Sequence, residues 1–267
     1  MRTVLALITL VVVTPFNASV SVIAGLLGVK DREGGVYRWA TRTWGAAMCW
    51  AAGTRIHTHN MEKLRDGTPR VLVANHISWF DVFALAAALP QAAFVSKAEL
   101  RRIPLFGRSM SAAGHVFVDR KNRKAAFAAY EDAAVRIRAG TTVVIFPEGT
   151  RGYDYTLRPF KKGPFVLAVA AGVPVTPILV QGTLEVMRKG SLRVRRHDIH
   201  LRVLDDISTE GCTYEDRDTL ADKAHAAMSA EQARWQNDST TTLHHSNVRN
   251  SLDSRPRDHR LARESND

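Results

Sequence analysis

The chain has 267 residues, of which 45% are hydrophobic, enough for one sizeable α/β domain with additional segments. Its net charge of +11 favours anionic partners, but residues 236–267 are balanced in charge, which excludes a basic C-terminal arm for nucleic acid. Cys49 and Cys212 stand far apart and no HExxH pattern occurs, so we expect neither a disulfide framework nor a metal site.

The N-terminal segment carries no charged residue over positions 3–29. About 20 apolar residues cross a bilayer as a helix, so a membrane anchor is predicted here. Pro15 and Asn17 interrupt the run and leave a single span, a hairpin and an interfacial helix open. A cleaved signal peptide is the alternative, but residues 18–20 form a poor cleavage site and apolar sequence resumes directly afterwards.

Basic and aromatic residues follow the apolar run. Basic residues beside an apolar segment mark its cytoplasmic end, so this end is expected in the cytoplasm. Residues 36–51 show helical periodicity, with aromatic side chains of the kind found at membrane interfaces. This helix lies at the interface, packs on the folded domain, or does both. The basic residues are Lys30, Arg32, Arg38 and Arg42, and the aromatic ones are Tyr37, Trp39, Trp44 and Trp50.

From about residue 53, short apolar runs alternate with helical stretches. This alternation predicts an α/β fold with a mainly parallel sheet flanked by helices, behind the N-terminal membrane-associated helical element. Ligands bind at the carboxyl ends of the strands in such folds. We expect strands over 70–74, 92–96, 115–118, 142–146, 175–180 and 199–204, and helices over 79–89, 104–113, 124–139, 165–171 and 219–235.

Composition divides the chain into three parts. Residues 1–56 are the predicted membrane anchor and interfacial amphipathic helix, and residues 57–235 are the predicted catalytic domain. Residues 236–267 are rich in serine, threonine, asparagine and arginine and poor in aromatic residues, so they are expected to form a disordered polar tail.

The first motif, Asn75-His-Ile-Ser-Trp-Phe-Asp81, directly follows a predicted strand. Ser78 and Asp81 have the spacing of a capping box, so the motif could simply open a helix. The same geometry brings the carboxylate of Asp81 within reach of the imidazole of His76. The carboxylate would then fix the tautomer, and the other ring nitrogen could take a proton from a hydroxyl. From this motif alone, both interpretations remain open.

The second motif, Phe146-Pro-Glu-Gly-Thr-Arg151, also follows a predicted strand. Gly149 allows the backbone to approach a ligand closely, and Thr150 offers a hydroxyl. Arg151 carries the planar donor fork that suits phosphate. In isolation, a turn with a surface arginine explains the string equally well.

In combination the two motifs resemble the glycerolipid acyltransferase family, and more narrowly the 1-acylglycerol-3-phosphate (lysophosphatidate) acyltransferases. Intermediate blocks of the family correspond to residues 97–107 and 114–120, and a late block to residues 173–178. The resemblance covers about residues 55–205, in order and at the family's spacing.

The resemblance implies a role for each motif residue. His76 would be the catalytic base and Asp81 its partner, with Asn75 and Ser78 supporting them. The phosphate of the acyl acceptor would be bound by Lys97, Arg120 and Arg151, with Glu148, Gly149 and Thr150 shaping the pocket. The family uses neither a metal nor a bound cofactor, and its acyl donor is a thioester of coenzyme A or of acyl carrier protein.

The implied reaction transfers a fatty acyl chain to the free sn-2 hydroxyl of 1-acyl-glycerol-3-phosphate and forms phosphatidic acid for phospholipid biosynthesis. The expected location is the plasma or inner membrane, with the catalytic domain on the cytoplasmic face. Three alternatives remain: an acyltransferase for another lysophospholipid or a lyso-aminolipid, a membrane-bound lipid hydrolase, and a silent lipid-binding protein. The absence of a GxSxG elbow weighs against the hydrolase.

Residues 187–197 contain five basic side chains: Arg188, Lys189, Arg193, Arg195 and Arg196. A solvated hairpin explains this cluster, and contact with anionic lipid headgroups is the alternative.

Overall fold

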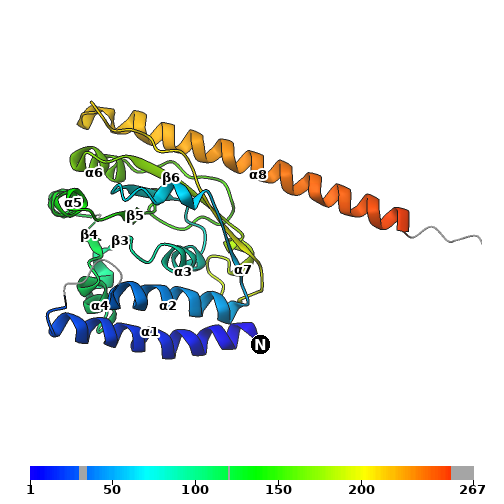
Figure 1. Ribbon diagram of the computed structural model, residues 1–267, viewed down its shortest axis with the longest axis horizontal. Helices are drawn as coiled ribbons and strands as arrows, with labels where there is room; N and C mark the ends of the chain where they lie inside the picture. Colours follow the sequence, from blue (N-terminus) through cyan, green and yellow to red (C-terminus); the bar gives the residue numbers. More distant parts are fainter. Residues whose placement is uncertain (30–34, 120, 254–267) are drawn as a thin grey trace, which may run out of the picture. The chain divides into compact units, whose positions relative to one another are not determined.

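The computed structural model describes residues 1–29, 35–119 and 121–253 (Figure 1). Met1–Ser229 form one compact unit, and a second unit begins at Ala230, within the last helix. The elements discussed below belong to the first unit, apart from the part of that helix beyond Ser229.

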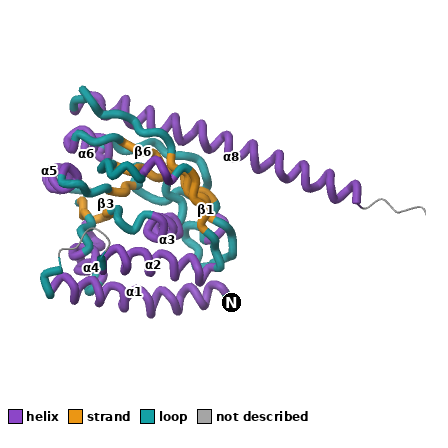
Figure 2. Tube along the Cα trace, in the orientation of Figure 1, coloured by secondary structure: helices purple, strands orange, loops and turns teal. Residues whose placement is uncertain are grey.

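A seven-stranded sheet forms the centre of the first unit, in the order β1-β7-β6-β2-β5-β3-β4. Figure 2 shows the strands in orange between the helices. β6 and β7 pair antiparallel, and every other neighbouring pair is parallel. The carboxyl ends of β6, β2, β5, β3 and β4 therefore share one edge. The strands are β1 (Ile56–His59), β2 (Val71–Ala74), β3 (Ala93–Lys97), β4 (Val116–Val118), β5 (Val143–Ile145), β6 (Val175–Gln181) and β7 (Ile199–Val203).

Helices cover both faces of the sheet, because its central strands are apolar on both sides. In β2, Leu72 and Ala74 face one core, whereas Val71 and Val73 face the other. The first core lies under α2 (Val36–Ala52) and α3 (Trp79–Ala88). The second lies under α5 (Arg123–Arg138), α6 (Gly163–Ala171) and the first turns of α8 (Arg217–Asp253). The predicted fold class is confirmed.

The N-terminal residues form a helical hairpin packed on this domain (Figure 1). α1 (Arg2–Leu26) continues through Pro15 without a break, and α2 returns beside it. α1 also contacts α4 (Phe106–Ala112), and α2 packs on α3. Gly45 allows that approach, since a Cβ there would lie 2.4 Å from the carbonyl oxygen of Phe83.

The outer face of α1 is apolar and exposed. Within the described residues, α1 alone is long and apolar enough to cross a membrane. Both of its ends touch the folded unit. Near the start, Thr3 Oγ1 accepts a hydrogen bond from Val194 N (3.0 Å), and near the end Gly25 lies against Ala112. Side chains on the outer face that are at least half exposed are Val4, Ile8, Val11, Val12, Phe16, Ile23 and Leu26.

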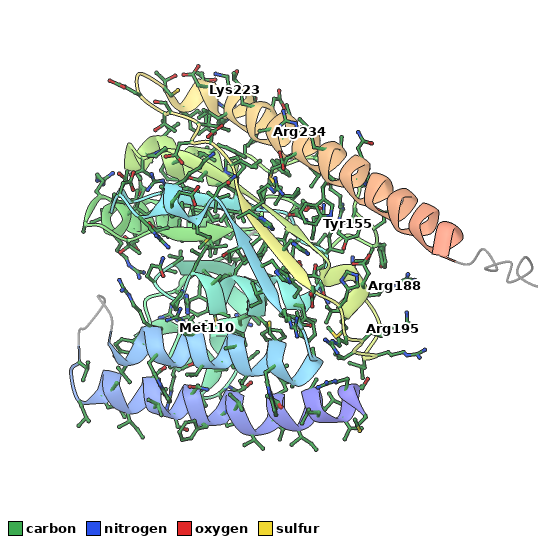
Figure 3. The ribbon with its side chains drawn as sticks, turned by 45° about the vertical axis from the view of Figure 1, so that its right-hand side comes forward. Met110, Tyr155, Arg188, Arg195, Lys223 and Arg234 are labelled. Carbon is green, nitrogen blue, oxygen red and sulfur yellow. The ribbon has the colours of Figure 1, made fainter. Side chains whose placement is uncertain are left out.

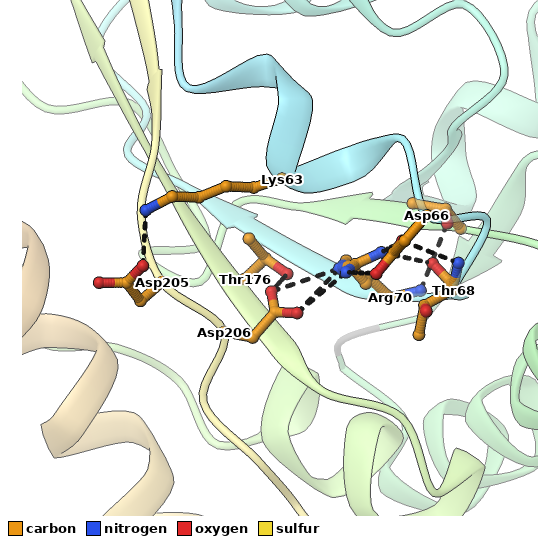
Figure 4. A network of polar contacts seen from close by, with 8 residues as sticks. Lys63, Asp66, Thr68, Arg70, Thr176, Asp205 and Asp206 are labelled. Atoms are coloured by element: carbon orange, nitrogen blue, oxygen red, sulfur yellow. Dashed lines mark hydrogen bonds and ion pairs between the residues drawn. The ribbon is translucent and has the colours of Figure 1, made fainter.

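A buried arginine fixes the start of β2 (Figure 4). Arg70 is 3% exposed and donates to the carboxylates of Asp66 (2.7 Å) and Asp206 (3.1 Å). Thr176 Oγ1 donates to Asp206 as well. Hydrogen bonding to Asp66 raises the pKa of Arg70 and lowers that of Asp66. Two carboxylates thus neutralise this cation, as expected for a structural one.

Most predicted elements coincide with observed ones, but short elements were missed. No prediction covered β1, α7 (Thr183–Val186) or the 3-10 helices Met61–Leu64, Ala98–Arg102 and Tyr214–Asp216. α8 continues to Asp253, beyond the predicted 219–235, into residues expected to be disordered. The division of the chain at residues 56 and 235 stays a prediction.

Candidate active site

Both sequence motifs follow neighbouring strands that end at the same edge of the sheet. The first motif leaves β2, and the second leaves β5, its parallel partner. The two loops are bonded directly: Gly152 N donates to His76 O (2.8 Å), and His76 N donates to Glu148 Oε1 (2.8 Å). The imidazole of His76 stacks on Phe146, with ring centroids 4.0 Å apart.

His76 and Asp81 form a hydrogen-bonded pair. His76 Nδ1 lies 2.8 Å from Asp81 Oδ2, and Asp81 is fully buried. Because the ionised carboxylate only accepts, Nδ1 carries the proton and Nε2 is the ring nitrogen left for another proton. The same oxygen accepts the N–H groups of Ile77 (2.7 Å) and Ser78 (2.8 Å). Asp81 therefore caps α3 and orients His76 at the same time, so the capping role and the predicted catalytic role are geometrically compatible.

Ser78 and Asn75 support this loop. Ser78 Oγ accepts from Phe80 N (3.2 Å) as the N-cap of α3 and donates to the carbonyl of Met187 (2.6 Å). Asn75 exchanges two hydrogen bonds with the main chain of Val180, at 2.7 and 2.9 Å, and so pins the end of β2 to β6. Both geometries fit supporting roles.

Glu148, which belongs to the second motif, holds the two loops together by accepting the hydrogen bond from His76 N. The residue is 4% exposed. Burial raises the pKa of Glu148 to about 7, and the backbone hydrogen bonds from His76 and Arg158 oppose this rise. Gly149 adopts φ +76° at the turn that follows, a conformation that glycine adopts without strain. Thr150 is exposed on the same turn.

Arg151 lies over the first residue of α3. Its Cζ is 4.8 Å from the ring centroid of Trp79. Desolvation lowers the pKa of Arg151 and Asp81 opposes the shift, but a guanidinium stays protonated at neutral pH. Within the described part of the chain, Arg151 forms no ion pair with a carboxylate. A positive group is thus held beside the His76 loop.

Of the other two residues expected to bind the phosphate, the structure describes Lys97 but not Arg120. Lys97 ends β3 and is exposed at the edge where His76 and Glu148 lie, without a hydrogen bond to either in the structure as described. Arg120 lies outside the described residues. The catalytic and binding roles implied by the resemblance stay predictions for all of these residues.

Sequence reasoning did not place the segment that follows β6 at the site. Residues 182–189 touch both motif loops: Met187 through Ser78, and Lys189 through Arg151, whose carbonyl accepts from Lys189 Nζ (2.7 Å). Tyr155, labelled in Figure 3, donates to Glu185 and accepts from Gly182 N (2.8 Å). These contacts join residues distant in sequence, so local periodicity gave no signal for them.

An apolar cavity of about 490 Å³ lies beside the site, between the α1–α2 hairpin, α3 and α4. Trp79, under Arg151, and Met187, bonded to Ser78, both line it. Among its few polar groups is His115, which accepts the N–H of Phe94 at Nδ1 (2.8 Å). Burial lowers the pKa of His115 to about 4, so this side chain is neutral.

The arrangement combines three chemical capacities. Nε2 of His76 can take a proton from a hydroxyl, the cations beside it can hold an anionic group, and the cavity can hold a long apolar chain. Chemistry between a hydroxyl and a lipid carrying a negative charge fits this combination.

Comparison with known proteins gives the same picture. The sequence model of the family described as Acyltransferase matches residues 55–181. An uncharacterized acyltransferase of Schizosaccharomyces pombe is 34% identical over 223 residues, which cover 82% of this chain and 79% of that protein. The 1-acyl-sn-glycerol-3-phosphate acyltransferase of Cocos nucifera is 31% identical over 199 residues, covering 74% of this chain and 63% of that protein.

Human 1-acyl-sn-glycerol-3-phosphate acyltransferase alpha is 32% identical over 178 residues, covering 66% of this chain and 63% of that protein. Among solved structures, the 1-acyl-sn-glycerophosphate (LPA) acyltransferase PlsC from Thermotoga maritima superimposes with a TM-score of 0.67 at 25% identity. The match covers 88% of this chain and 99% of that one. The chain is therefore an enzyme of the acyltransferase family that contains the 1-acyl-sn-glycerol-3-phosphate acyltransferases.

Proposed function

We propose that this enzyme transfers a fatty acyl chain from an acyl thioester of coenzyme A or acyl carrier protein to the sn-2 hydroxyl of 1-acyl-glycerol-3-phosphate. The product is phosphatidic acid. The observation that carries this proposal is the contact between the two motif loops, which sets Arg151 beside the His76–Asp81 pair and next to the apolar cavity. Relatives named for the same reaction support it.

In the proposed mechanism, His76 Nε2 removes the proton from the acceptor hydroxyl while Asp81 stabilises the resulting imidazolium. The acceptor oxygen attacks the thioester carbonyl and the carbon–sulfur bond breaks. The sulfur takes the proton from the imidazolium of His76 and leaves as the free thiol. Ser78 Oγ is committed to capping α3 and to Met187, so direct transfer fits better than an acyl-serine intermediate. The cavity accepts an acyl chain during this step.

Thiol release by the purified, detergent-solubilised enzyme tests the proposal. Oleoyl-coenzyme A should release thiol only when lysophosphatidate is present, and phosphatidic acid should appear in equal amount. Release without an acceptor would indicate a hydrolase. A preference for a lysolipid that lacks the phosphate monoester would replace the proposed acceptor with that lysolipid. The same assay is then repeated with an acyl carrier protein thioester as the acyl donor.

The Arg151→Ala enzyme should show an apparent KM for lysophosphatidate raised by about tenfold or more, because a charge-assisted contact to the phosphate is lost. The apparent KM for acyl-coenzyme A should change little. Arg65→Ala is a matched control, since this exposed arginine precedes β2, at the opposite edge of the sheet. An effect confined to the donor would contradict the assignment of Arg151.

The enzyme is proposed to lie on the cytoplasmic face of the membrane, with α1 in the interface rather than across it. Both ends of α1 touch the folded unit, and one apolar face points outward along its length. A helix that packs on the folded unit with one face can bury its apolar outer face in one leaflet of the membrane. The basic loop 188–196 bonds the start of α1 through Val194, so it would lie at headgroup level.

Replacing the four exposed arginines of this loop, Arg188, Arg193, Arg195 and Arg196, by glutamine should weaken binding to anionic vesicles. Arg188 and Arg195 are labelled in Figure 3. Each basic residue near an anionic surface contributes roughly 1 kcal/mol, so the loss should exceed tenfold. Co-sedimentation with anionic and neutral vesicles measures it. Unchanged anionic binding would refute the role of the loop.

A further inference from the structure

Lys189 differs from the other basic residues of its loop in where its ammonium group lies. Its Nζ donates to the carbonyl oxygen of Arg151 (2.7 Å) and is 4.2 Å from the ring centroid of Tyr153. The neighbouring Arg188 and Arg193 are exposed, whereas Lys189 is partly buried. Lys189 therefore belongs to the turn that carries Arg151 rather than to the solvated part of the loop.

The position of Lys189 is fixed by the segment that precedes it. Met187 accepts a hydrogen bond from Ser78 Oγ, in the loop of His76. Glu185 accepts one from Tyr155, four residues beyond Arg151. The chain is thus anchored to both motif loops immediately before Lys189, so little conformational entropy remains to be lost when its side chain binds a ligand.

Across the residues that the structure describes, neither Lys189 nor Arg151 forms an ion pair. Arg70 shows the structural alternative, since two carboxylates neutralise it (Figure 4). A cation that no carboxylate pairs with directly can take a bound anion as its counter-ion.

We propose that Lys189 is a second cation of the acceptor headgroup site, beside Arg151, and that the pair selects acceptors carrying a dianionic phosphate monoester. This inference rests on the proposed function and specifies its acceptor. An ammonium has three donors, of which one goes to Arg151 O, so the others can reach a phosphate oxygen. A phosphodiester headgroup carries a single negative charge and gains less from the second cation.

The alternative role for Lys189 is a strap that only holds the Arg151 turn. Three substitutions separate the two roles. Lys189→Gln removes the charge and keeps an N–H donor for the carbonyl of Arg151. Lys189→Met removes both, and Lys189→Arg keeps both. Arg65→Gln is the matched control, because it removes one charge from an exposed position at the opposite edge of the sheet.

For the full-length enzyme, Lys189→Gln and Lys189→Met should each raise the apparent KM for lysophosphatidate by about tenfold or more, the usual cost of a lost charged contact. The apparent KM for acyl-coenzyme A should stay within about twofold, as expected when only acceptor binding is lost. Lys189→Arg should recover most of the loss, and Arg65→Gln should behave as wild type. A normal KM in Lys189→Gln would reduce Lys189 to a strap and overturn the inference, as would equal rises for both substrates.

A second measurement needs no turnover. Glycerol 3-phosphate, the headgroup without its acyl chain, should raise the Tm of the wild type and of Arg65→Gln more than that of Lys189→Gln. Glycerophosphocholine, a phosphodiester, should show a smaller difference between these proteins. Equal shifts with glycerol 3-phosphate in wild type and Lys189→Gln would overturn the inference. Wild-type thiol release with lysophosphatidate reports separately on the proposed function.

Discussion

The His76→Ala enzyme is expected to lose at least about a thousandfold in kcat while its fold stays intact, since a positioned general base contributes about this much. The imidazole is held from one side by Asp81 and stacked on Phe146, which leaves Nε2 for the acceptor hydroxyl. A second histidine–carboxylate pair, His57–Asp198, lies outside both motif loops. Acceptor-dependent thiol release measures the effect, and circular dichroism and Tm check the fold.

The chain offers a matched control for this substitution. His57, on the outermost strand β1, also pairs with an aspartate: its Nε2 lies 3.0 Å from Asp198 Oδ2. Both members of that pair are substantially exposed, and the pair is separate from the two motif loops. His57→Ala should therefore keep wild-type kcat. An active His76→Ala protein, or equal losses in both variants, would refute the assignment of His76 as the base.

The Asp81→Asn enzyme is expected to lose about a thousandfold or more in kcat with a smaller effect on the apparent KM values, by analogy with other His–carboxylate pairs. The neutral amide cannot stabilise the imidazolium formed in the transition state. It can also donate to Nδ1, which favours the tautomer with its proton on Nε2. That tautomer cannot accept the hydroxyl proton. Steady-state kinetics with lysophosphatidate and acyl-coenzyme A measures the change.

Asp81 also caps α3, so the substitution carries a stability cost of about 1 kcal/mol that must be separated from the catalytic effect. Asp216 provides the control, because it forms the same type of capping box with Thr213 and bonds no residue of the site. Asp216→Asn should lower stability slightly and leave kcat unchanged. A kcat loss in Asp81→Asn no larger than that in Asp216→Asn would show that Asp81 acts only as a cap.

The sequence was sufficient for the elements whose stability is local. Strands such as Val71–Ala74 are short, wholly apolar runs, and helices such as α5 combine periodicity with a glycine after the last turn. The prediction did not include β1 because three of the four residues in its sequence, Ile-His-Thr-His, are polar, and its strand conformation depends on pairing with β7. Strand pairing between distant segments depends on tertiary structure and leaves little local signal.

For the site, the sequence by itself determined which side chains each motif loop carries, because the residues of a motif are neighbours in the sequence. The pairing of His76 with Asp81 could be predicted for this reason, because the two residues are only five positions apart in the sequence. Only the tertiary structure decided how the loops meet: Gly152 on His76, Met187 on Ser78 and Lys189 on Arg151. These contacts join segments that follow three different strands, and sheet order, which brings those strand ends together, depends on packing across the whole domain.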